Sequence, residues 1–176
     1  MPAPSTPEVW LRGPLPGVPL ELMPVVHSLF QVREELAALV PSLRAEQLWI
    51  RPGGAASIGF HILHLAGSLD RLLTYARGEM LSDAQRHDLQ TEEEPGHPPV
   101  PLAALVGQST AAVDRGLLQL RATDASRMFD GRRVGRAGLP STVLGLIVHA
   151  AEHSTRHMGQ ALTTARILRG TTGGAI

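Results

Sequence analysis

The chain has 176 residues, of which 43% are hydrophobic, so it is long enough and apolar enough to form one domain with a buried core. Its 16 basic residues, all of them arginine, balance 16 acidic residues, and this zero formal net charge argues against a nucleic-acid partner. Cysteine is absent, which excludes disulfides, thiolate metal sites and a cysteine nucleophile, and the absence of lysine excludes Schiff-base chemistry.

The two ends of the chain are expected to lie outside the folded core. Residues 1–19 are rich in proline and glycine and predict an extended arm, which Trp10 and Leu11 attach to the domain surface. Residues 171–176 predict a flexible tail. The arm lacks the basic and then apolar pattern of a secretory signal, and no apolar run is long enough to span a membrane. We therefore expect a single cytoplasmic domain over residues 1–176, without membrane contact.

Four segments carry apolar residues at the spacing of an amphipathic helix. They are residues 20–40, 57–77, 101–121 and 141–169. Ser57 is placed to cap the second segment, Gly78 to end it, and Gly170 to end the fourth. Because no series of strands accompanies them, the sequence predicts an all-α four-helix bundle.

The connections between these helices are long. Residues 42–54 form the first. Residues 79–99 are polar, contain the acidic run 92–94 and predict a mobile surface loop. Residues 122–140 contain Asp130-Gly131, a pair that favours the turn of a short hairpin.

Histidines are concentrated in two of the predicted helices. Five of the eight in the chain fall in two short stretches, at His61, His64, His149, His153 and His157. This clustering is the most informative chemical feature of the sequence, because imidazole is a common metal ligand.

The spacing of the histidines limits which of them can share one metal ion. Each four-residue step along a helix rises about 6 Å, so His149 and His157 are about 12 Å apart and cannot both bind one ion. His153 with His157 is the better pair, since His157 lies nearer the apolar stripe. One histidine of the second helix, His61 or His64, would complete a three-histidine site with an open position, a pattern typical of catalytic zinc sites. Imidazole ligands also suit nickel, copper and iron. The competing interpretation is that these histidines only pack and hydrogen-bond inside the bundle.

Two segments resemble the DinB-like superfamily, which includes S-transferases that act with bacillithiol or mycothiol. The segments are residues 57–66 (SIGFHILHLA) and 153–160 (HSTRHMGQ). The resemblance implies an up-down-down-up bundle, often a homodimer, and a divalent metal such as zinc, nickel or iron held by His64, His153 and His157. The family often has arginine directly after the last histidine, whereas this chain has Met158, which is expected to point away from the ligands.

The first functional hypothesis is a metal-dependent transfer of a low-molecular-weight thiol to an electrophilic small molecule. Because the chain has no cysteine, the sulfur nucleophile must come from outside. The arginines at positions 132, 133 and 136 are candidates for binding carboxylates of the thiol or substrate. The remaining candidates for supporting the metal ligands or moving a proton are His61, His149, Glu152 and Gln160.

Two other functions use the same histidines. A metal-dependent hydrolase would activate water and would need a carboxylate base, for which Asp70 and Asp114 are candidates. A non-catalytic alternative is a dimeric, stress-related binding protein. A polar pocket open beside the histidines would favour an enzyme, and a closed site would favour the non-catalytic protein.

Overall fold

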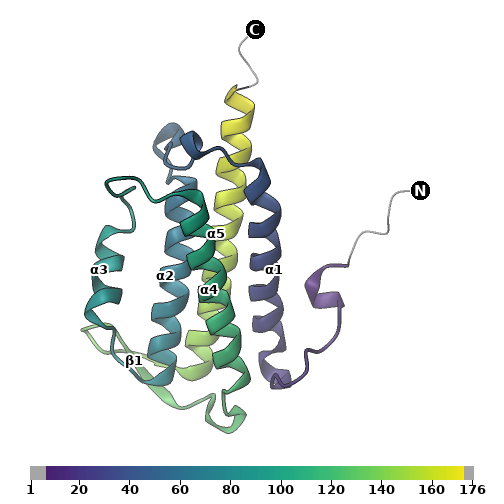
Figure 1. Cartoon of the computed structure of the whole chain (residues 1–176). Helices are drawn as coiled ribbons and strands as arrows, with labels where there is room; N and C mark the ends of the chain where they lie inside the picture. The colour runs from purple at the N-terminus through teal and green to yellow at the C-terminus, as the bar shows by residue number, and fades with distance from the viewer. Residues whose placement is uncertain (1–6, 173–176) are drawn as a thin grey trace.

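The computed structural model describes residues 7–172, and four long helices form a bundle in it (Figure 1). They are α1 (Met23–Leu39), α2 (Ile58–Arg77), α4 (Leu102–Arg121) and α5 (Val143–Thr172). In Figure 1 the chain runs upward through α1 and α5 and downward through α2 and α4. The all-α four-helix architecture predicted from the sequence is confirmed, and the order of directions is up-down-down-up.

Shorter elements connect the long helices. Helix α3 (Asp83–Thr91) lies in the connection between α2 and α4. Strands β1 (Gly131–Val134) and β2 (Leu139–Thr142) form an antiparallel hairpin before α5. Single 3-10 turns, η1 to η6, lie at Val9–Leu11, Leu20–Leu22, Val40–Ser42, Ala45–Gln47, Pro52–Gly54 and Ala125–Arg127. Among the helices of the described residues, none is long and apolar enough to cross a membrane.

Local hydrogen bonds set where the helices of the site begin and end. Ser57 Oγ accepts a hydrogen bond from the backbone N–H of Phe60 at 3.1 Å, so it caps α2 as predicted. Gly78 ends α2 with φ +86°, a left-handed conformation that favours glycine. Thr142 Oγ1 accepts from the N–H of Gly145 at 3.0 Å at the start of α5. Helix α5 then continues to Thr172, beyond the end predicted at Gly170, and residues 173–176 of the predicted tail lie outside the described residues.

The segment 79–99 is not the structureless loop that its polarity predicts. Ser82 Oγ accepts from the N–H of Gln85 at 3.1 Å, and Gln85 Oε1 accepts from the N–H of Ser82 at 2.9 Å. This reciprocal pair is a capping box that starts α3. No residue of α3 is buried, so the helix has no apolar stripe and periodicity does not reveal it.

The hairpin is present, but its turn lies later than predicted. Gly131 is the first residue of β1 rather than part of the turn, and Val134 pairs with Leu139. The turn between them contains Gly135 and Gly138, both with positive φ. Two left-handed glycines suit this tight turn better than Asp130-Gly131, which explains the shift.

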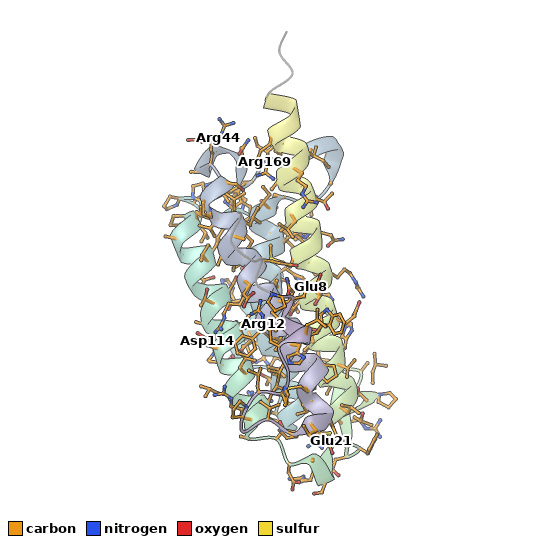
Figure 2. All side chains as sticks on the ribbon, turned by 90° about the vertical axis from the view of Figure 1, so that its right-hand side faces the viewer. Glu8, Arg12, Glu21, Arg44, Asp114 and Arg169 are labelled. Atoms are coloured by element: carbon orange, nitrogen blue, oxygen red, sulfur yellow. The ribbon has the colours of Figure 1, made fainter. Side chains whose placement is uncertain are left out.

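The N-terminal arm is attached by different residues from those predicted. Trp10 and Leu11 are exposed, whereas Val9 is buried. Arg12 donates to both carboxylate oxygens of Glu34 on α1, at 2.5 and 2.8 Å, and Figure 2 shows Arg12 on the face of the bundle. The part of the arm before residue 7 lies outside the described residues.

The core consists of two apolar clusters, and α2 contributes to both. Leu69 and Leu73 of α2 lie in one, and Ile58, Ile62 and Leu65 lie in the other. Helix α2 makes its most extensive contacts with α5. The histidine-bearing faces of these two helices are therefore held against each other.

Candidate metal centre

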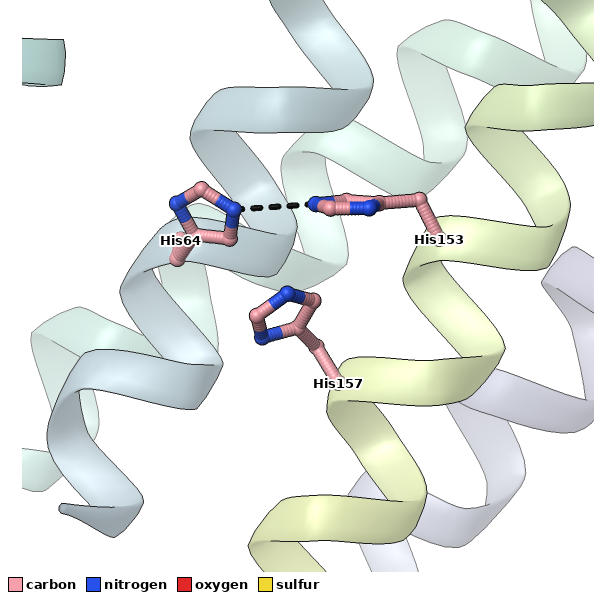
Figure 3. Close-up of side chains that lie close together, drawn as sticks. All are labelled: His64, His153 and His157. Carbon is pink, nitrogen blue, oxygen red and sulfur yellow. Dashed lines mark hydrogen bonds between the residues drawn. The ribbon is translucent and has the colours of Figure 1, made fainter. Parts of the chain in front are cut away.

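Three histidines from α2 and α5 meet where these helices pack. One ring nitrogen each of His64, His153 and His157 lies within 4.8 Å of the others. His64 Nε2 and His153 Nε2 are 2.9 Å apart. Figure 3 shows the three rings converging in the space between the two helices. The i, i+4 spacing on α5 brings His153 and His157 to the same side, with ring centroids 4.5 Å apart.

Glu92 forms a hydrogen bond with Nδ1 of His64, the ring nitrogen that does not face His153. Its Oε1 lies 2.5 Å from His64 Nδ1. Arg71 donates to both oxygens of the same carboxylate, at 3.0 and 3.1 Å, and both Glu92 and Arg71 are buried. A carboxylate accepts from Nδ1–H, so the Nε2 of His64 keeps its lone pair for the centre.

His61 plays the corresponding part for His157. The two Nδ1 atoms are 3.1 Å apart, in a hydrogen bond that requires one ring to donate and the other to accept. With Nδ1 of His157 engaged on His61, its Nε2 is the nitrogen that faces the other two ligand candidates. Outer hydrogen bonds thus orient two of the three rings.

The electrostatics of the cluster favour the neutral form of His61, His153 and His157. Burial, followed by the charge of His64, lowers the pKa of His153 and His61. Burial and the neighbouring His64 and His153 lower the pKa of His157 to about 3. Neutral imidazoles retain the lone pairs that a metal ion needs, so these rings are ready to act as ligands near neutral pH.

The donor set fits a divalent metal ion. Three imidazoles converge, and the protein supplies no fourth ligand from among the described residues in this group. His153 Nδ1 is buried and has no hydrogen-bond partner among residues 7–172. No hydrogen bond at Nδ1 therefore opposes the orientation in which Nε2 faces the other two histidines. Three histidines with an open position suit zinc, and imidazole also suits nickel and iron.

Phe60 covers one side of the cluster. Its ring stacks on His64, with centroids 5.1 Å apart and planes 22° apart, and meets His61 and His157 edge to face. A hollow of about 50 Å³ next to Phe60 is lined by Arg51, Ala56, Ser57 and Glu93. His64 keeps 17% of its side chain exposed, so the centre is not sealed from solvent.

His149 and Glu152 form an exposed group beside the centre. His149 Nδ1 lies 3.2 Å from Glu152 Oε2, and Arg156 binds the other oxygen of the same carboxylate. The hydrogen bond from Arg156 lowers the pKa of Glu152. The His149 ring lies 5.4 Å from that of His153, centroid to centroid, one turn further from the cluster.

Met158 and Gln160, which follow His157 in the resemblance motif, lie in different surroundings. Met158 is buried in the core with Leu105 and Ala161, away from the ligand cluster as predicted. Gln160 is exposed, and its side chain makes no hydrogen bond within the described part of the chain.

The arginines predicted to bind carboxylates lie far from the histidines. Arg132 Nε donates to the carbonyl of Ala76 at 2.8 Å, and Arg133 Nη1 donates to the carbonyl of Gly138 at 3.1 Å. Ala76 is more than three turns after His64 on α2, a rise of about 18 Å along the helix. The structure therefore brings His61 to the three-histidine cluster but not these arginines. Arg132 donates to backbone near the other end of α2, and Arg133 donates to backbone in the turn of the hairpin.

Glu92 and Arg71 are not among the site residues predicted from the sequence. Glu92 lies in an acidic run whose composition indicates a solvated loop, and only this member of the run is buried. Two signals were available: the Ser82-to-Gln85 capping box and the position of Arg71 seven residues after His64, on the same face of α2.

Comparison with known proteins agrees with this geometry. The family model of the DinB superfamily matches residues 28–161 and so runs from within α1 to the middle of α5, including all three clustered histidines. A search of curated proteins gives no match to this chain. A family match over most of the chain, together with the bundle and its histidine cluster, places the chain in the DinB superfamily.

Proposed function

We propose that His64, His153 and His157 hold a divalent metal ion, and that the protein uses it to transfer a low-molecular-weight thiol to an electrophilic small molecule. The observation that carries this proposal is the convergence of three imidazoles, with no fourth protein ligand in the group among the described residues, in a chain that has no cysteine of its own. A divalent ion at this position would lower the pKa of a bound thiol and so supply thiolate near neutral pH.

The residues around the cluster prepare it for this role. Glu92 holds His64 by its Nδ1–H, and His61 engages the Nδ1 of His157, so both rings keep their Nε2 toward the centre. Phe60 covers one side of the His64 ring by stacking on it. Such outer contacts raise ligand basicity and prevent rotation of the rings.

The proposed reaction is a substitution at carbon. The thiol loses its proton to solvent, its sulfur forms a bond to the electrophilic carbon, and the leaving group departs with the electrons of the bond that breaks. The substrate is a small molecule, and the thiol is of the bacillithiol or mycothiol type. No described cationic side chain other than Arg51 borders the hollow beside Phe60, so Arg51 is the nearest candidate for a carboxylate of either.

The test is a thiol-transfer assay with purified protein loaded separately with zinc, nickel and iron. Bacillithiol or mycothiol is supplied with monochlorobimane, whose product is fluorescent. We expect transfer above the uncatalysed rate, lost in the double variant His153→Ala with His157→Ala and kept in the double variant His87→Ala with His97→Ala, whose histidines are exposed. Transfer at the uncatalysed rate with every metal and both thiols would contradict the proposed activity.

The hydrolase alternative has weaker support. Asp114 is bonded to Arg33, and the carboxylate of Asp70 accepts from Gln85. Glu92 is the carboxylate nearest the histidines, but it is already engaged by His64 and Arg71. Glu93 borders the hollow beside Phe60 and forms no ion pair among residues 7–172, but it does not belong to the group of donor atoms formed by the three histidines.

A non-catalytic metal-binding protein is the second candidate. The small size of the hollow beside Phe60, about 50 Å³, favours it. The homodimer expected from the resemblance is compatible with both candidate functions. Exposed apolar side chains such as Trp10, Leu11 and Phe129 support it. Equilibrium sedimentation at several protein concentrations tests it.

A further inference from the structure

A large cavity lies away from the three clustered histidines, beneath the connection that carries α3. It has a volume of about 730 Å³ and is bounded by α2, α3, α4 and the segment that follows α3. Ligand sites typically measure about 300–1,000 Å³. Leu63, Ala66 and Val100 give it apolar walls, and none of the three clustered histidines lines it.

The charged groups of this cavity are mostly acidic and unneutralised. Asp70, Asp88 and Glu94 line it, and none of them forms an ion pair with a basic residue among residues 7–172. Asp70 accepts a hydrogen bond from Gln85, a neutral amide that leaves its charge uncompensated. Arg115 is the one basic residue of the wall and also has no ion pair within the described chain.

Glu92 forms part of the wall between the cavity and the histidine cluster. Its buried carboxylate is neutralised by Arg71 and hydrogen-bonded to His64, so it does not add to the free negative charge. Gly67 lies beside it, and a Cβ at that position would lie 2.6 Å from Arg71 and 3.0 Å from Glu92. A molecule in the cavity would therefore lie next to the group that orients a metal ligand, without reaching the histidines.

We propose that this cavity binds a small organic cation, an amine with an apolar body. The three unpaired carboxylates attract the ammonium group, and the apolar wall covers the body. An anion would meet three like charges and one arginine, which disfavours it. The proposal goes beyond the thiol-transfer function, because it requires neither metal nor thiol.

The test uses a panel of aryl-alkyl amines that includes tryptamine, each compared with the alcohol and the carboxylate of the same body, here tryptophol and indole-3-acetate. Binding to the full chain is followed by the amide NMR signals of Gly67 and Gly107, which line the cavity. We expect millimolar or tighter binding of amines, weaker binding of alcohols and none of carboxylates. The double variant Asp88→Asn with Glu94→Gln should weaken amine binding about fivefold, whereas Arg115→Gln should leave it unchanged or tighten it.

A second pair of variants separates filling of the cavity from unfolding. Gly107 lies in α4 on the cavity wall, and a Cβ there meets no atom within 4 Å, so Gly107→Phe can begin a bulky side chain on this wall without a contact at its Cβ. Gly170 of α5 is equally open but lies outside the cavity, so Gly170→Phe is its control. Amine binding should be lost in the first and kept in the second. The proposal is overturned if no amine of the panel binds at millimolar concentration, if carboxylates bind as well as amines, or if Gly107→Phe binds normally.

Discussion

The orientation of His64 depends on a single buried carboxylate. Glu92 accepts from its Nδ1–H and is itself held by two hydrogen bonds from Arg71. Glu92→Gln replaces a charged acceptor with a neutral amide, so we expect metal affinity to fall about 10- to 100-fold. Competition with a chromophoric chelator measures the change. The control is Glu93→Gln, which alters the exposed neighbour. Equal metal affinity in both variants would show that Glu92 does not support the metal site.

Gly67 provides the space in which Arg71 and Glu92 meet. A Cβ at this position would approach Arg71 Nη1 to 2.6 Å, closer than such contacts allow. We expect Gly67→Ala to displace the ion pair and weaken metal binding, even though alanine favours the helix by about 1 kcal/mol. Gly159→Ala in α5, where a Cβ meets nothing within 4 Å, is the comparison. Helix content by circular dichroism and metal affinity should move in opposite directions only for Gly67→Ala.

The histidine cluster was predictable because its spacing is local. The i, i+4 rule pairs His153 with His157 from sequence alone, whereas the choice between His61 and His64 depended on the resemblance to a family. The partner Glu92 was not predictable from composition, because its burial depends on how the chain between α2 and α4 folds back. Arg132 and Arg133 were candidates for carboxylate binding only because they form a cluster of positive charge in the sequence. Their hydrogen bonds to backbone carbonyls depend on the fold of the hairpin, which the sequence does not specify in that detail.

At the scale of the element, the two caps allow a direct comparison. Ser57 caps α2, which carries core residues and ligand candidates, whereas Ser82 caps α3, which has no buried residue. We expect Ser57→Ala to lower the free energy of unfolding by about 1 kcal/mol. Ser82→Ala should instead open α3 locally, seen as faster amide exchange in 83–91, with little change in global unfolding. Equal global effects of the two substitutions would contradict this division.

The same contrast explains which elements could be predicted. The four long helices bury one face, and burial produces the apolar periodicity by which they are recognised. Helix α3 is exposed all round and is marked only by its capping box. The hairpin was indicated, but its turn was assigned to Asp130-Gly131 because glycine alone does not report which of several candidates adopts a positive φ.

At the scale of the whole molecule, the packing of α2 against its neighbours supports the centre. Leu69 is fully buried in one of the two apolar clusters of the core. Leu69→Ala should cost about 2–5 kcal/mol of unfolding free energy by leaving a cavity. Leu118→Ala, at a side chain that is 63% exposed, should cost far less. Urea denaturation of the two variants tests this, and similar midpoints would show that the core is not where the structure places it.

The central claim is that His64, His153 and His157 together hold one metal ion. The most direct measurement is metal content by elemental mass spectrometry on untagged protein, as isolated and after reconstitution with zinc, nickel or iron. We predict about one ion per chain, lost in His153→Ala with His157→Ala and retained in His87→Ala with His97→Ala, two histidines that lie exposed in the connection between α2 and α4. A chain that takes up no ion under any of these conditions would contradict the account, and the cluster would then be a hydrogen-bonded packing motif of the bundle.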